Sequence, residues 1–271
     1  MSLVSTDWLN ENLKNVKIID ASWHLDKNRN AIEEYNKEHI ENSIFFDLDK
    51  NSNLNKDLPH GHFLPSSSNH ERAVSEMGIL NTDRIIIYCY SDLISSCRAW
   101  FQFLYFGHNP KLISVLNGGM KKWKLEGKKV TNTKTKIIPS KYTAKENTNM
   151  IKIKSEVDEN IKNKKFLILD ARSKNRFFGL EPEPRPGIKS GSIKDSKSLP
   201  LNELVNAKNN TFLNKEKLKN IFDLKEVSGN EIVMSCGSSV SASSLALAYS
   251  IINDDYIAKI YIGSWTEFGK N

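Results

Sequence analysis

Cysteine is scarce in this chain, which has only three among its 271 residues: Cys89, Cys97 and Cys236. An odd number cannot form a closed disulfide framework, and the three lack the paired spacing of a zinc site. The six histidines show no ligand-like spacing either. We therefore expect no metal, and we look for one reactive thiol among cysteines that otherwise fill the core.

Long apolar runs are also missing, and none approaches the roughly 18 to 20 residues that span a bilayer. The N-terminal segment lacks the basic and then apolar pattern of a secretory signal, and Asp7 and Glu11 argue against a transit peptide. Gly118-Gly119 stands alone and fits a turn rather than a nucleotide-binding loop. We expect a cytoplasmic protein that has no membrane partner and needs no cofactor.

The composition is otherwise that of an ordinary soluble globular protein, with 39% hydrophobic and 26% charged residues. The formal charge of +7 comes from scattered lysines, without the interleaved aromatic residues or the finger pattern of a nucleic-acid-binding protein. We therefore expect no nucleic-acid partner. The positive charge fits the attraction of a small anionic substrate, and it fits a Lys- and Asn-rich codon bias equally well.

The chain repeats itself at an offset of roughly 145 to 150 residues, which indicates a domain duplication rather than a short solenoid repeat. Four blocks recur in the same order in each half. The first half contains VKIIDAS (16–22), HIENSIFFDLD (39–49), RIIIYCYSD (84–92) and SVLNGGMKKW (114–123). The second half contains FLILDAR (166–172), SIKDSKSLPL (192–201), NEIVMSCGSS (230–239) and KIYIGSWTEF (259–268).

The blocks are short apolar runs, rich in Ile, Val, Leu and Tyr, that are typical of strands buried on both faces. Helical patterns lie between them, at 96–108, 214–224 and 241–253. Strands that alternate with helices predict an α/β fold, with a mostly parallel sheet flanked by helices in each half. We expect tandem domains at 1–131 and 151–271, joined by a polar linker over about 132–150.

One cysteine stands where chemistry is expected, because ligands of open α/β sheets bind beyond the carboxyl ends of strands. Cys236 follows the strand EIVM and precedes a helix, and the residues around it are small. Backbone N–H groups and the positive helix end would favour a thiolate there, or a bound anion. The alternative is an inert cysteine at a strand end. In the first half Tyr90 takes the equivalent place, so we expect Cys89 and Cys97 to be packed in the core.

Several motifs together resemble a known family: the duplicated domain, CGSSVSA at a strand-to-helix turn, EPEPRPGI, and a closing GSWTEFG. The chain resembles the rhodanese superfamily over nearly its whole length. Within it, the chain is most similar to the 3-mercaptopyruvate sulfurtransferases, whose loop begins CGSG. The resemblance implies a Cys236 persulfide that takes sulfur from 3-mercaptopyruvate, releases pyruvate, and passes sulfur to cyanide or to a thiol acceptor such as thioredoxin.

The resemblance also implies roles for particular residues. Arg176 and Arg185 would hold the donor, consistent with the suitability of Arg for carboxylates. A proton relay of Asp49, His62 and Ser238 would serve Cys236, in a site between the two domains. The loop residues expected to bind substrate are Gly237, Ser239, Val240 and Ser241. His60 is a rival for the place of His62, although the match to His-x-Leu-Pro favours His62.

The chain departs from the family pattern at several positions. Ser239 stands where the family usually has Gly, and its Cβ would strain a backbone that requires positive φ. Ser241 replaces the usual Thr, and Gly191 is followed by Ser-Ile-Lys-Asp-Ser rather than His-Ile-Pro-Gly-Ala. We expect the Ser239 change to alter the rate or the donor preference more than to abolish activity, whereas the change after Gly191 affects the packing of a turn that is not catalytic. Arg98 matches a family arginine without a clear role.

Three other functions can be compared with the sequence. A thiosulfate sulfurtransferase would usually carry basic residues directly after the cysteine, and Gly237 and Ser238 are not basic. A rhodanese-like phosphatase would need an Arg six residues after the cysteine, where this chain has Ala242. A persulfide carrier without its own small-molecule donor would not need the two arginines or the relay.

Overall fold

The computed structural model describes residues 2–55, 58–227, 229–254 and 256–270, and it divides into two compact units. Unit 1 comprises Met1–Ser52, Leu64–Asn147 and Asn206–Phe212. Unit 2 comprises Asn53–Phe63, Thr148–Val205 and Leu213–Asn271. Each half of the sequence therefore lends one short segment to the unit built mainly from the other half.

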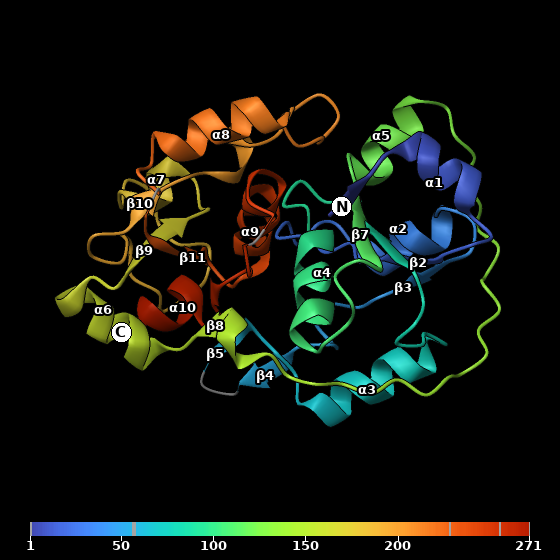
Figure 1. The fold of residues 1–271 in the computed structure, drawn as a ribbon, viewed down its shortest axis with the longest axis horizontal. Coiled ribbons are helices and arrows are strands. Elements are labelled where there is room, and N and C mark those ends of the chain that lie inside the picture. Colours follow the sequence, from blue (N-terminus) through green and yellow to red (C-terminus); the bar gives the residue numbers. More distant parts are fainter. Residues whose placement is uncertain (1, 56–57, 228, 255, 271) are drawn as a thin grey trace. The chain divides into compact units, whose positions relative to one another are not determined.

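Unit 1 is built around a five-stranded sheet whose strands all pair in parallel, in the order β1-β7-β6-β2-β3. Figure 1 labels β2, β3 and β7 of this sheet. Its strands are β1 (Leu3–Val4), β2 (Lys17–Asp20), β3 (Ser43–Phe45), β6 (Ile85–Tyr88) and β7 (Ile113–Leu116). Its helices are α1 (Thr6–Asn12), α2 (Ala31–Lys37), α3 (Ser67–Glu76), α4 (Ser96–Tyr105) and α5 (Gly119–Leu125). The central strand β6 is buried along its whole length because helices flank the sheet.

Unit 2 repeats this design with a parallel sheet in the order β10-β9-β11-β12-β8. Its sheet strands are β8 (Ile151–Lys152), β9 (Phe166–Asp170), β10 (Lys197–Ser198), β11 (Glu231–Ser235) and β12 (Ile260–Tyr261). Its α-helices are α6 (Lys154–Asn163), α7 (Lys174–Phe177), α8 (Lys215–Asp223), α9 (Val240–Ile252) and α10 (Ser264–Phe268). Short 3-10 turns lie at Thr148–Met150 and Leu201–Glu203, and β4 (Asn53–Asn55) pairs with β5 (Leu58–Phe63).

The two strand orders correspond one to one, which confirms the predicted duplication and the predicted α/β class. Each repeated block supplies the matching strand in both units, for example β6 and β11. The predicted helices are also present as α4, α8 and α9. Helix α9 is apolar on nearly every side and its first nine residues are buried, as expected of a helix packed against a sheet.

The predicted linker is polar, but much of it packs as an extended segment on unit 1. The backbone N–H of Ser140 donates to the carbonyl of Ser75 at 2.9 Å, and that of Asn147 donates to Tyr105 at 2.8 Å. The Tyr142 hydroxyl lies 3.3 Å from His108 Nδ1. The segment has no helical or strand period because individual backbone and side-chain hydrogen bonds hold it.

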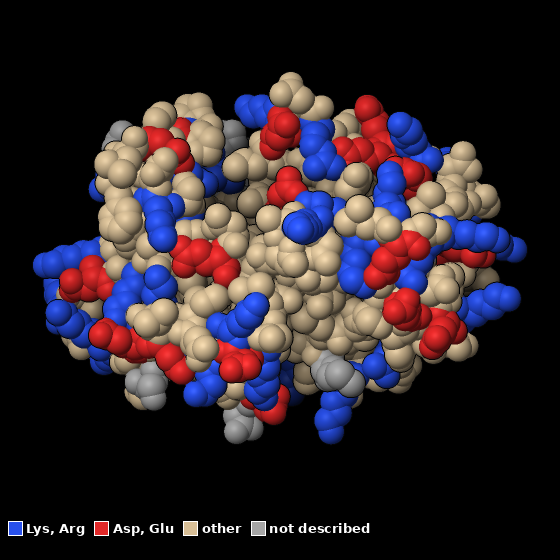
Figure 2. Space-filling model, turned by 90° about the horizontal axis from the view of Figure 1, so that it is seen from above, with Lys and Arg blue, Asp and Glu red and all other residues tan. Residues whose placement is uncertain are grey.

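Surface charge is mixed on the face drawn in Figure 2, where Lys and Arg lie among Asp and Glu rather than in a single basic patch. No described helix is both long and apolar enough to cross a membrane.

Candidate active site

Cys236 begins the loop that joins β11 to α9, and the start of α10 holds this loop in place. The N–H of Trp265 donates to the Cys236 carbonyl at 2.9 Å. The N–H and the hydroxyl of Thr266 both donate to the Gly237 carbonyl, at 2.9 and 2.6 Å. Because two loop carbonyls are bound on this side, the loop has a defined course beneath the Cys236 side chain.

Ser264, the first residue of α10, binds the loop from its N–H side. Its Oγ accepts hydrogen bonds from the N–H of Cys236 at 3.3 Å and of Ser239 at 3.1 Å, and it donates to the Tyr261 carbonyl at 2.9 Å. Ser264 is fully buried and has a φ of 49°. Such a φ is strained for a residue with a Cβ, and strain of this kind gathers at functional sites. The serine belongs to the GSW motif, but no local pattern in the sequence indicates this role.

Ser239 has the positive φ that its replacement of a family glycine implied, with φ 61° and ψ 1°. Its hydroxyl donates to the carbonyl of His62 at 3.3 Å, and its own carbonyl accepts from Ser243 Oγ at 2.9 Å. The extra side chain therefore ties the loop to β5 while its backbone carries strain. Val240 and Ser241 follow it as buried first residues of α9.

Ser238 stands at the centre of a buried hydrogen-bonded group. Its Oγ accepts from Arg185 Nη2 at 2.8 Å and lies 2.9 Å from His62 Nδ1. A guanidinium only donates, so the hydroxyl hydrogen of Ser238 is available to an unprotonated Nδ1. His62 and Ser238 are 5% and 3% exposed. The structure thus brings together three of the predicted site residues from β5, the EPEPR segment and the Cys236 loop.

The carboxylate of Asp49 belongs to unit 1, where it accepts a hydrogen bond from Trp23 Nε1 at 3.0 Å. The nearby Asp47 has a local role, because its Oδ1 accepts from the N–H of Lys50 at 3.1 Å within the same turn. Of the two aspartates in the FFDLD run, Asp47 therefore binds within its own turn and Asp49 binds Trp23. The side chain of His60 lies outside the described residues.

Arg176 and Arg185 both reach the loop at Gly237. A Cβ at position 237 would lie 2.9 Å from Arg185 Nη1 and 3.1 Å from Arg176 Nη2. The absence of a side chain at Gly237 is therefore what lets two guanidinia approach the backbone directly after Cys236. Two guanidinia at one point form a natural binding place for a carboxylate.

A buried carboxylate that was not among the predicted site residues, that of Glu183, binds Arg176. Glu183 Oε2 is 2.5 Å from Arg176 Nη2, and Glu183 Oε1 is 2.7 Å from Arg172 Nη1. Arg172 in turn lies 2.7 Å from Asp170 Oδ2 at the end of β9, and its guanidinium stacks 4.6 Å from the Trp265 ring. The repeated DAS and DAR motifs, with an arginine only in the second, were the available signal for this network.

The pKa values of two arginines in and beside this network shift in opposite directions. Burial would lower the pKa of Arg172, but Asp170 and Glu183 more than offset it, so that its pKa is raised. Burial lowers the pKa of Arg185, and Arg176 adds to this, whereas the charges of Cys236 and Glu183 act in the opposite direction. Arginine nevertheless stays protonated in proteins, so Arg185 is a buried cation beside the loop.

Burial alone does not distinguish the three cysteines, because Cys89, Cys97 and Cys236 are all buried and none is in a disulfide. Cys89 lies 3.3 Å from Ser96 Oγ, and burial raises the pKa of its thiol, which fits the packed role predicted for it. Arg98 is fully buried in unit 1, where it donates to Gln102 Oε1 at 3.2 Å. It does not belong to the unit that contains Cys236.

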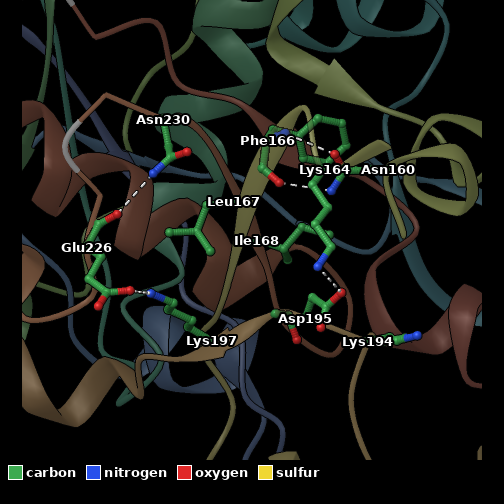
Figure 3. Close-up of a pocket in the computed structure, with 11 residues that line it drawn as sticks. Asn160, Lys164, Phe166, Leu167, Ile168, Lys194, Asp195, Lys197, Glu226 and Asn230 are labelled. Atoms are coloured by element: carbon green, nitrogen blue, oxygen red, sulfur yellow. Dashed lines mark hydrogen bonds and ion pairs between the residues drawn. The ribbon is translucent and has the colours of Figure 1, made fainter. Parts of the chain in front are cut away.

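A separate cavity of about 200 Å³ lies at the opposite edge of the unit 2 sheet, near the amino ends of β9 and β10. Figure 3 shows Lys197 paired with Glu226 and Lys164 paired with Asp195 along this cavity. None of the predicted site residues lines it. Two of its lysines, Lys164 and Lys197, pair with carboxylates. Because no predicted site residue lines the cavity, it is distinct from the Cys236 site.

Comparison with known proteins agrees with this geometry. A family model described as a rhodanese-like domain matches residues 5–126 and 154–271. The chain belongs to the rhodanese-like family. Both copies of the domain are matched, so the resemblance inferred from the loop and the repeats is confirmed.

Several relatives of this rhodanese-like chain are sulfurtransferases. It is 34% identical to thiosulfate/3-mercaptopyruvate sulfurtransferase 1, mitochondrial, of Arabidopsis thaliana, over 98% of this chain and 75% of the relative. It is 33% identical to the 3-mercaptopyruvate sulfurtransferase of Mus musculus, over 98% of this chain and 91% of the relative. The crystal structure of SseA from Escherichia coli, a 3-mercaptopyruvate sulfotransferase by its description, superposes with a TM-score of 0.86 at 28% identity, covering 98% of this chain and 99% of SseA.

Proposed function

We propose that this rhodanese-like protein is a sulfurtransferase that carries sulfur as a persulfide on Cys236 and takes it from 3-mercaptopyruvate. The observation that carries the proposal is the hydroxyl of Ser238, which lies 2.8 Å from Arg185 Nη2 and 2.9 Å from His62 Nδ1, two residues after the nucleophile. A substrate-binding cation and a proton-transfer group thus meet at one hydroxyl.

Donor binding is assigned to the two arginines. Arg176 and Arg185 converge at Gly237, where they would bind the carboxylate and the carbonyl oxygen of the donor. Loop residues Ser239, Val240 and Ser241 shape the place that receives sulfur. The donor's thiol would then lie beside Cys236, because a mercapto-acid carries its sulfur only a few bonds from its carboxylate.

Sulfur transfer follows from this arrangement. The Cys236 thiolate attacks the donor sulfur, an S–S bond forms, and the C–S bond breaks with its electron pair going to carbon. The resulting enolate takes up the proton lost by the donor thiol and leaves as pyruvate. Ser238 and His62 carry this proton, with Asp49 as the third member of the proposed relay. A thiol acceptor such as thioredoxin, or cyanide, then removes the outer sulfur and restores Cys236.

Thiosulfate is the second candidate donor, because the relatives include enzymes of both kinds at similar identity. The thiosulfate sulfurtransferase of Mus musculus is 32% identical over 98% of this chain. Against thiosulfate stands the loop, which carries no Lys or Arg from Gly237 to Ser241. A carrier without a small-molecule donor would not require the buried Arg185, Ser238 and His62 group. We place the enzyme in the cytoplasm, without a nucleic-acid or membrane partner.

The decisive experiment supplies purified protein with 3-mercaptopyruvate or thiosulfate and a thiol acceptor, and follows pyruvate, sulfite and sulfide release. Cys236→Ser is the control for the nucleophile, and Cys89→Ser controls for the loss of a buried thiol elsewhere. We expect turnover with mercaptopyruvate that requires Cys236 and exceeds turnover with thiosulfate. Faster turnover with thiosulfate would overturn the donor assignment, and no turnover with either would favour the carrier.

A further inference from the structure

Ion pairs join four side chains of unit 2 next to the Cys236 loop, and Arg185 meets one of them, Arg176, at Gly237. We call these five side chains the arginine–carboxylate cluster. Its members are Asp170, Arg172, Arg176, Glu183 and Arg185. The side chains of Asp170, Arg172 and Glu183 are at most 2% exposed, and that of Arg176 is 15% exposed. Water therefore screens these charges poorly, and the number of charges in the cluster matters for any anion that enters it.

The cluster holds three guanidinia and two carboxylates, so its own net charge is +1, before the Cys236 thiolate beside Arg185 is counted. Glu183 is the member that sets this balance at the binding place. It is bound by Arg172 on one oxygen and by Arg176 on both, with Arg176 Nε 3.2 Å from Oε1 and Nη2 2.5 Å from Oε2. Burial lowers the pKa of Arg185, and the charge of Glu183 raises it in opposition, as does the charge of Cys236.

We propose that Glu183 determines donor specificity by limiting the positive charge of the binding place to what a singly charged carboxylate donor requires. This inference rests on the proposed function. 3-Mercaptopyruvate brings one negative charge, whereas thiosulfate is a dianion. Without Glu183 the same two guanidinia would present an additional net charge at Gly237, where a dianion gains more from it than a monoanion does.

Glu183 is therefore a positioning residue that acts through Arg176 and Arg185. It leaves the sulfur-transfer step itself unchanged, because in both reactions the Cys236 thiolate attacks the donor sulfur that becomes the outer sulfur of the persulfide. With thiosulfate the S–S bond of the donor breaks and sulfite leaves with the electron pair. No further reactant is needed.

The test is the ratio of kcat/KM for thiosulfate to kcat/KM for 3-mercaptopyruvate in Glu183→Gln. We expect this ratio to rise about tenfold, because the added charge favours the dianion in a poorly screened place. Glu181→Gln is the matched control: it removes a carboxylate of the same segment, one that accepts a hydrogen bond from the hydroxyl of the exposed Ser173 at 2.7 Å. Its ratio should stay within about twofold of the wild type.

A compensating variant separates charge from local packing. Glu183→Gln combined with Arg176→Gln restores the net charge of the cluster, so its ratio should return toward the wild-type value even though both rates fall. A ratio that stays raised in this double variant, or that never rises in Glu183→Gln, overturns the inference.

Two further measurements apply if Glu183→Gln does not fold or if the wild type prefers thiosulfate. If Glu183→Gln does not fold, Arg176→Gln alone must lower the ratio, and an unchanged ratio overturns the inference. The wild-type preference tests the proposed donor separately: an enzyme that prefers thiosulfate contradicts that proposal, while the shift caused by Glu183→Gln still tests the role of Glu183.

Discussion

The hydroxyl of Ser264 accepts a hydrogen bond from the backbone N–H of Cys236 at 3.3 Å, although the two residues are 28 positions apart. The same oxygen accepts the N–H of Ser239 at 3.1 Å. One side chain from α10 thus binds the N–H groups at both ends of the Cys236 loop, so the course of this loop depends on α10.

Replacing Ser264 by Ala should loosen the loop more than it weakens the fold. The change leaves two buried N–H groups without their acceptor, which costs about 1 to 3 kcal/mol of unfolding free energy. We expect kcat to fall about tenfold, since a loop that no longer holds Cys236 loses its alignment. The measurements are chemical denaturation and the rate at which iodoacetamide alkylates Cys236.

The control for this change is Ser250→Ala, which removes a hydroxyl that donates to the Leu247 carbonyl within α9. Its kcat should match that of the wild type. Equal alkylation rates and equal kcat for Ser264→Ala and the wild type would show that the loop keeps its course without the hydroxyl.

Ser239 combines a strained backbone with a useful hydroxyl, and two substitutions separate these effects. Ser239→Ala keeps the Cβ at a φ of 61° and loses the bond to the His62 carbonyl, so stability should fall. Ser239→Gly loses the same bond but relieves the strain. We expect the Gly variant to be about 1 kcal/mol more stable than the Ala variant by urea denaturation. An Ala variant as stable as the Gly variant would mean that the backbone at this position is not strained.

A methyl group at Gly237 should disturb donor binding rather than folding. In Gly237→Ala the new Cβ would lie 2.9 Å from Arg185 Nη1, and only the ends of flexible side chains have to move. We expect KM for 3-mercaptopyruvate to rise at least about tenfold, which corresponds to about 1.4 kcal/mol of lost binding, with a change in Tm of a few degrees at most. An unchanged KM for 3-mercaptopyruvate in Gly237→Ala would contradict the placement of the donor at this glycine.

His70 should make the protein sensitive to acid. Burial, with the charges of Arg98 and His108, lowers the pKa of His70 to about 3. Its ring stacks on Phe106 at 4.2 Å, and its Nε2 has no hydrogen-bond partner among the described residues. In the unfolded chain His70 binds a proton below its pKa of about 6.5, whereas in the folded state it binds one only as the pH approaches 3. The free energy of unfolding is therefore highest above pH 6.5 and falls as the pH falls toward 3.

The measurement is the free energy of unfolding of the wild type and of His70→Phe between pH 7 and pH 4.5. The phenyl ring keeps the stacking and cannot be protonated. Over this range we expect the wild type to lose about 2 to 3 kcal/mol more than the variant. Parallel pH profiles would show that His70 takes up its proton in the folded state.

The sequence by itself determined the α/β class and the duplication, because strand runs and helical intervals are local patterns that survive without knowledge of the fold. The repeated blocks led directly to the equivalent strands β6 and β11. The edge strands β1 and β8 are two residues long, and their pairing depends on neighbours that only the folded sheet supplies. The packing of the linker on unit 1 could not be predicted for a similar reason, because its hydrogen bonds to Ser75 and Tyr105 follow no periodic pattern in the sequence.

At the site, the sequence alone pointed to Cys236, because small residues between a strand and a helix are a local requirement of an anion-binding loop. Tyr90 in the equivalent turn distinguished the two halves in the same way. Only the tertiary structure decided which distant side chains support that loop: Ser264 on its N–H groups, and Glu183 beneath Arg176. Hydrogen bonds and buried ion pairs between residues far apart in the chain depend on the packing of whole elements, which no local pattern encodes.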